Sequence, residues 1–194
     1  MLKAEKKEIP IVAFPSQKAF EVWLSKNHSS VSALWVRFFK KGSGEKTITY
    51  AQALDVALQY GWIDSQLKTY DAASYLQKFT PRGPKSIWSK INTEHIERLI
   101  KEKKMKPAGM VQVEAAKKDG RWQSAYSSPK NMEIPADFLK ELKKNKVAFA
   151  FFKSLTKANV YAIAWRLHTA KKPETRLKRM KAILEMLASG KSFH

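Results

Sequence analysis

The chain has 194 residues, 44% of them hydrophobic, and it contains no cysteine. This length fits one domain or one domain with two subregions, and the apolar content excludes global disorder. The lack of thiols excludes disulfides, thiolate catalysis and cysteine metal sites. The formal net charge is +20, which favours polyanionic partners such as nucleic acid or anionic lipid, although a lysine-rich surface that serves solubility accounts for the same charge.

The charge excess lies mainly in the second part of the chain. Residues 1–80 carry 11 lysines and arginines against 7 acidic residues, whereas residues 81–194 carry 26 against 10. Residues 1–8 are charged and lack an apolar segment, which predicts that there is no signal peptide. The longest apolar runs are far shorter than the ~20 residues of a transmembrane helix. We therefore expect a cytoplasmic protein.

Hydrophobic periodicity in the first half predicts a mixed layer of strands and helices. Strands are expected at residues 9–14, 32–40, 62–69 and 74–79, and helices at 16–26 and 50–60. Thr49 is expected to cap the second helix, and Gly61 suits the position after its end. Residues 70–73 are expected to join the last two strands as an antiparallel hairpin.

The second half is predicted to be helical. Helices are expected at residues 93–104, 107–118, 135–144, 157–170 and from Pro173 onward, with an irregular segment at 121–134. The apolar run Val147 to Leu155 is expected to be buried. The predicted fold is therefore α+β: a small, mostly antiparallel N-terminal sheet with two helices at residues 1–92, followed by a C-terminal helical bundle at 93–194 that packs on it.

The loop from Phe79 to Asn92 is the strongest candidate for a binding site. Pro81 and Pro84 restrict its backbone, and Gly83 allows a ligand to approach closely. A helix that follows it would present N–H groups to an anion, Arg82 can bind an oxyanion with two donors, and nearby lysines and serines add charge and hydrogen bonds. The predicted ligand-binding residues are Trp62, Asp64, Arg82, Lys85, Ser86, Trp88, Ser89 and Lys90. The alternative is a structural loop in which Trp88 packs in the core.

Asp64 lies between large apolar residues of a predicted strand and shares one face with Trp62. It is either paired with a cation such as Arg82 or serves as a general base. A paired aspartate would have a pKa below its ordinary value and would be a poor base at neutral pH. Pairing is the commoner arrangement.

A second basic group surrounds the start of the last predicted helix. Lys171, Lys172, Arg176 and Arg179 form a candidate polyanion surface, although helix capping and a solvated cationic face account for much of this pattern. The four histidines lack metal-ligand spacing, so we predict no metal and no cofactor. The serines lack a nucleophile elbow, which favours a protein that is not an enzyme.

Five segments resemble one known family. They are Gly61-Trp62-Ile63-Asp64-Ser65, Phe79 to Asn92, Met105-Lys106-Pro107-Ala108-Gly109, Asp119-Gly120-Arg121-Trp122 and Thr169 to Arg176. Together they resemble the bacterial YdeI/OmpD-associated family, also described as a bacteriocin-protection family, over roughly residues 10–190. The resemblance implies tolerance of antimicrobial peptides and association with an outer-membrane porin, and it implies no catalytic residues. It also implies a glycine where this chain has Lys103-Lys104.

These observations give three functional hypotheses. The first is a non-enzymatic anion-binding or antimicrobial-tolerance protein that holds an anionic small molecule or phosphate group at the Arg82 loop. The second is a nucleic-acid-binding protein that uses the basic C-terminal half. The third is an enzyme for an anionic small molecule, with Asp64 as base and Arg82 orienting the substrate. Simple sequestration of cationic peptides is disfavoured because a chain of charge +20 repels them.

Overall fold

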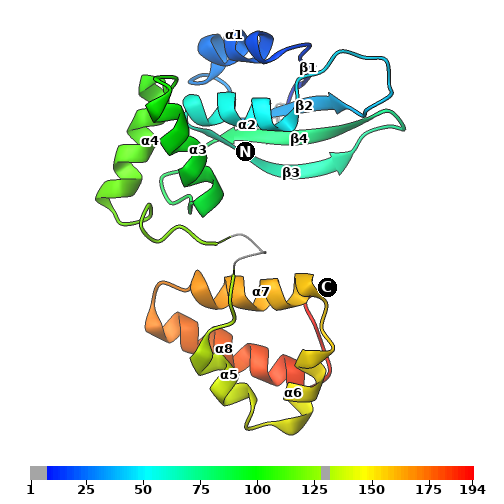
Figure 1. Ribbon diagram of the computed structural model, residues 1–194, viewed down its shortest axis with the longest axis vertical. Helices are drawn as coiled ribbons and strands as arrows, with labels where there is room; N and C mark the ends of the chain where they lie inside the picture. Colours follow the sequence, from blue (N-terminus) through cyan, green and yellow to red (C-terminus); the bar gives the residue numbers. More distant parts are fainter. Residues whose placement is uncertain (1–7, 128–131) are drawn as a thin grey trace, which may run out of the picture. The chain divides into compact units, whose positions relative to one another are not determined.

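The computed structural model describes residues 8–127 and 132–194 (Figure 1). The chain divides into two compact units. The sheet unit consists of residues up to Trp88 together with Asn92–Ser124, and the helical unit consists of Ser89–Ile91 and Ala125–His194. Residues 92–124 therefore group with the sheet. The division into domains at residue 92 stays a prediction.

The sheet unit contains four strands in the order β1-β2-β4-β3. Strand β1 (Ile11–Ala13) runs parallel to β2 (Leu34–Phe39). Strand β4 (Ser74–Pro81) lies antiparallel between β2 and β3 (Trp62–Thr69). The α+β fold class with a mostly antiparallel N-terminal sheet is confirmed. The hairpin of β3 and β4 is also confirmed, and its ladder is irregular between Asp64 and Leu67.

Helices α1 (Gln17–Asn27) and α2 (Tyr50–Gln59) lie on the same side of this sheet (Figure 1). Each begins at a side-chain cap: Ser16 Oγ accepts from Ala19 N, and Thr49 forms a reciprocal capping box with Gln52. Along β2, buried residues alternate with half-buried ones. The buried set packs with the two helices in one hydrophobic core, which includes Phe20, Leu24, Leu34, Val36, Phe38, Val56, Trp62 and Phe79.

Helices α3 (Lys90–Lys101) and α4 (Pro107–Lys118) follow β4 and pack beside α2. Arg98 of α3 donates to both carboxylate oxygens of Asp55 in α2, at 2.6 Å each. Gly109 of α4 lies against the C-terminal end of α2, where an added Cβ would lie 2.3 Å from the Gln59 carbonyl oxygen. Only glycine permits this approach of the two helices.

The helical unit contains α5 (Ala136–Leu142), α6 (Lys146–Lys153), α7 (Lys157–His168) and α8 (Pro173–Ala188). Its core is formed by apolar residues of all four helices: Phe138, Leu142, Ala148, Ile163, Leu167, Met180, Ile183 and Leu187. The prediction that the whole run from Val147 to Leu155 is buried is wrong for Val147, which is 67% exposed. This run forms a helix, so its residues point in turn to the core and to solvent. Part of the predicted irregular segment 121–134 lies outside the described residues.

Lys103 has a left-handed backbone, with φ of 56°, just after the end of α3. Lysine is strained in this conformation and glycine is not. We expect Lys103→Gly to raise the free energy of unfolding by about 0.5–1 kcal/mol in urea denaturation. The matched control is Lys101→Gly in the last turn of α3, which should destabilise because glycine disfavours helix. Equal destabilisation by both substitutions would contradict the left-handed assignment.

Candidate functional site

The described part of the helical unit contains a cleft along one side of α7. Its volume is about 420 Å³, and its lining residues are Lys157, Ala158, Tyr161, Ala162, Trp165, Arg166 and His194. Helical spacing explains this set, because residues four apart lie on one side of a helix. Lys157, Tyr161 and Trp165 form one row, and Ala158, Ala162 and Arg166 form the next. The two alanines have the smallest side chains of the set, and they leave the space that larger residues would fill.

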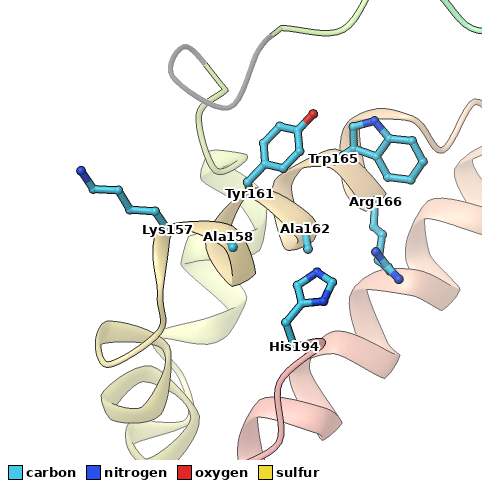
Figure 2. Close-up of a pocket in the computed structure, with 7 residues that line it drawn as sticks. All are labelled: Lys157, Ala158, Tyr161, Ala162, Trp165, Arg166 and His194. Atoms are coloured by element: carbon cyan, nitrogen blue, oxygen red, sulfur yellow. The ribbon is translucent and has the colours of Figure 1, made fainter. Parts of the chain in front are cut away.

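Figure 2 shows how the side chains lie around these alanines. The Tyr161 and Trp165 rings extend on one side of the alanine row, and the His194 ring and the Arg166 guanidinium lie on the other side. Lys157 stands at the start of the helix and at the edge of the group. The first turn of α7 also contributes the positive end of the helix dipole near Lys157. The cleft is therefore aromatic on one side and cationic on the other.

The position of His194 depends on the buried side chain of Asn159. Asn159 Oδ1 accepts from the backbone N–H groups of Phe193 and His194, at 3.1 and 3.0 Å, and its Nδ2 donates to the His194 carbonyl oxygen at 3.2 Å. The same Nδ2 donates to Thr156 Oγ1, the N-cap of α7. A single buried amide thus satisfies three backbone groups, and it fixes residues 193–194 against α7.

Arg166 and Lys157 give the cleft its positive charge. The Arg166 guanidinium lies 3.9 Å from the centre of the Phe193 ring, an arrangement that orients the charge without neutralising it. Within the described ranges, neither Arg166 nor Lys157 forms an ion pair. Burial raises the pKa of the Tyr161 phenol, and Tyr126 adds to this shift. Tyr161 therefore keeps its proton at neutral pH and can donate a hydrogen bond.

In the loop predicted to bind anions, Arg82 and Ser86 contact other residues of the same loop. Arg82 is 6% exposed, its guanidinium lies 3.6 Å from the centre of the Trp88 ring, and it donates to the Ile87 carbonyl oxygen. Ser86 Oγ accepts from Gly83 N at 3.0 Å. Trp88 is buried and its ring centre is 5.1 Å from that of Trp122. Lys85 remains exposed. The assignment of this loop to ligand binding stays a prediction.

The remaining predicted site residues are distributed over both units. Trp62 is buried in the core of the sheet unit and donates to the His28 carbonyl oxygen at 3.1 Å. Asp64 accepts from the Tyr50 hydroxyl at 2.9 Å. Burial raises the pKa of Tyr50, and the Asp64 carboxylate adds to this shift. Ser89 and Lys90 belong to the helical unit, where Lys90 N donates to Tyr126 O. Trp62 and Trp88 are both 1% exposed.

Two of the four predicted basic-surface residues, Arg176 and Arg179, form hydrogen bonds with other residues of the helical unit. Arg176 of α8 donates through both terminal nitrogens to Asp137 of α5, and this contact lowers the pKa of Asp137. Arg179 donates to the Arg166 carbonyl oxygen at 2.8 Å. Lys171 and Lys172 are exposed between α7 and α8. The basic surface as a nucleic-acid site stays a prediction.

Sequence reasoning missed the residues of the cleft. It predicted a helix at residues 157–170 and named no site residue on it. The available signal was the presence of Tyr161 and Trp165 on that helix, with Arg166 next to them. The contribution of Asn159 could not be found, because its partners are 34 and 35 residues away.

Comparison with known families divides the chain into two regions, and their boundary lies near the boundary between the two compact units. Residues 12–112 match the family described as a domain of unknown function, DUF8412. The chain belongs to the DUF8412 family. Residues 131–190 match a second family, OmdA, described as "Bacteriocin-protection, YdeI or OmpD-Associated". No curated protein and no solved structure gives a significant match.

These matches refine the resemblance inferred from the sequence. The YdeI/OmpD-associated likeness is confirmed only for the C-terminal part, and most of the segments that suggested it lie in or near the DUF8412 region. Helices α7 and α8 of this DUF8412 protein lie wholly inside the OmdA match, and so do all the cleft residues except His194. No helix in the described residues is both long and apolar enough to span a membrane.

Proposed function

We propose that this protein is a non-enzymatic anion-binding protein with a role in protection against antimicrobial agents, and that the cleft along α7 is its binding site. The observation that carries the proposal is the placement of Arg166, without an ion pair in the described residues, opposite two aromatic rings in a cleft of about 420 Å³. The protective role rests on the OmdA match, which contains α7.

The lining residues favour a flat ligand with an oxyanion. Tyr161 and Trp165 offer ring faces and edges for apolar contact, and Tyr161 also offers a hydroxyl donor. Arg166 can bind a carboxylate or phosphate through two parallel hydrogen bonds. A cleft of this size with few polar groups among apolar ones has the ordinary character of a small-molecule site.

The same residues lack the carboxylates and aliphatic hydroxyls that many catalytic sites use. The seven lining residues include no carboxylate, serine or threonine, so the cleft offers no aspartate or glutamate base and no aliphatic hydroxyl nucleophile. We place the ligand here and not at the Pro81–Lys90 loop, because Arg82 is buried on Trp88. An anion at that loop would have to draw this guanidinium away from its ring.

Isothermal titration with phenyl phosphate, benzoate and inorganic phosphate tests the proposal. We expect phenyl phosphate to bind more tightly than inorganic phosphate, because only the former has a ring to contact Tyr161 and Trp165. Arg166→Gln removes the charge, and Ala158→Leu fills the cleft from an exposed position. Arg166→Gln should weaken binding of phenyl phosphate at least tenfold, since a hydrogen bond to a charged group contributes about 1.5–3 kcal/mol. Ala158→Leu should weaken it as well, because the larger side chain takes the space of the ligand.

The matched control is Lys178→Gln, which removes one exposed charge from α8 of the same unit. It should leave the affinity within twofold, because it changes only the long-range potential. Equal binding by the wild type, Arg166→Gln and Ala158→Leu would show that the ligand does not occupy the α7 cleft. Loss of binding in Arg82→Lys alone would instead support the loop.

A further inference from the structure

The sheet has a second face, opposite to the one that packs with α1 and α2. Trp35, Arg37 and Phe39 of β2 point to this face, because their neighbours Leu34, Val36 and Phe38 belong to the core. Trp35 pairs with Lys78 of β4, and Arg37 pairs with Leu76. Leu76 in turn pairs with Lys68 of β3. Helices α3 and α4 of the unit pack beside α2.

Cations and aromatic rings alternate on this face, where Leu76 is buried beneath the surface and Trp35, Arg37, Phe39 and Lys78 are half-buried. Lys68 Nζ lies 4.6 Å from the centre of the Trp35 ring, and Lys78 Nζ lies 5.9 Å from it. The Arg37 guanidinium lies 4.5 Å from the Phe39 ring centre and 5.0 Å from that of Tyr70, which is 48% exposed. Each ring therefore has a positive charge within contact distance.

The acidic groups near this face are few. Asp71 pairs with Arg37 at 2.7 Å and also accepts from Ser74 and Ala73 N. Asp64 is engaged by Tyr50 of α2. Within the described residues Lys68 and Lys78 form no ion pair. The open face thus keeps two uncompensated ammonium groups next to an indole ring.

We infer that this open face, defined by Trp35, Arg37, Phe39, Lys68, Tyr70 and Lys78, binds single-stranded nucleic acid. The rings offer surfaces on which unstacked bases can stack, and the lysines can turn from the rings toward the phosphates. A duplex fits less well, because its bases are already stacked on each other. The attraction to a polyanion comes from the cations of this face itself, Arg37, Lys68 and Lys78. This site is separate from the α7 cleft and does not depend on it.

Fluorescence anisotropy with labelled oligonucleotides tests the inference. The probes are 12-nucleotide oligo-dT and oligo-U and a 12-base-pair DNA duplex. We expect both single strands to bind more tightly than the duplex at the same salt concentration. Trp35→Ala should weaken binding of oligo-dT about tenfold or more, which is the effect of losing one stacked base. A preference between oligo-dT and oligo-U reflects both the sugar and the 5-methyl group of thymine, and either preference supports the site.

The double variant Lys68→Gln/Lys78→Gln separates stacking from charge. It should weaken binding. It should also make the plot of the logarithm of the binding constant against the logarithm of the salt concentration less steep by about 1.4, because each phosphate contact on a single strand contributes about 0.7 to the steepness. Lys68 is exposed and Lys78 is half-buried, so circular dichroism checks that the double variant and Trp35→Ala keep the fold. The matched control is Lys101→Gln/Lys118→Gln, which removes two exposed charges from α3 and α4 of the same unit and should leave binding unchanged. Equal weakening by this control, or a duplex that binds as tightly as oligo-dT, would overturn the inference.

Discussion

Replacing Gly109 by alanine is expected to lower the free energy of unfolding of the sheet unit by about 3 kcal/mol. An added Cβ would lie 2.3 Å from the Gln59 carbonyl oxygen and 2.8 Å from Met105 Cε. The Met105 side chain can move, but the carbonyl belongs to the end of α2, so α4 and α2 must separate. Urea denaturation followed by circular dichroism measures the loss.

Gly83→Ala is the matched control for this substitution. Gly83 lies in an exposed loop, and an added Cβ there would have only Ser86 Oγ nearby, at 3.7 Å. The change should therefore alter stability by less than about 0.5 kcal/mol. If Gly109→Ala were as stable as Gly83→Ala, the close packing of α4 on α2 would be contradicted.

The second large effect is expected at Arg82. Arg82→Ala should lower the free energy of unfolding by about 3 kcal/mol, because it removes a desolvated cation–π contact of about 2 kcal/mol and a hydrogen bond of about 1 kcal/mol. The contacts are the Trp88 ring, at 3.6 Å, and the Ile87 carbonyl oxygen. Arg82→Lys should recover only part of this loss, because an ammonium cannot stack as a planar guanidinium does. Urea denaturation followed by circular dichroism measures the loss.

Lys85→Ala is the control from the same loop. Lys85 is exposed, and its removal should change stability by less than about 0.5 kcal/mol. The structural role of Arg82 would be contradicted if Arg82→Ala were as stable as Lys85→Ala. If that stable variant had also lost its affinity for phenyl phosphate, the loop would be the anion site after all.

Local signals in the sequence were sufficient to predict the positions of most helices and strands. Thr49, the apolar stripe of α2 and Gly61 define both ends of that helix, and the structure begins and ends it within one residue of the prediction. The order of the strands could not be predicted, because β1 pairs with β2, and β4 lies between β2 and β3, through contacts distant in sequence. Val147 shows the same limit: an apolar run predicts burial, but the helical period decides which residue faces solvent.

The residues of the candidate site were harder to predict, because the same residue types occur in binding sites and in buried structural contacts. An arginine and a tryptophan in a proline-rich loop suit an anion site. They suit a buried cation–π pair equally well, and Arg82 and Trp88 form such a pair at 3.6 Å. Arg166 carried no motif at all. Its importance comes from the alanines beside it and from residues 193–194, which Asn159 holds in place.

The most direct test of the α7 cleft is a titration of the ¹⁵N-labelled protein with phenyl phosphate, followed by heteronuclear NMR. Binding in the cleft predicts saturable shifts of the backbone amides of residues 157–166 and 193–194, which belong to the lining helix and the segment held by Asn159. It also predicts little change at residues 82–88. Shifts concentrated at residues 82–88, or no saturable shift in α7, would contradict the proposed site.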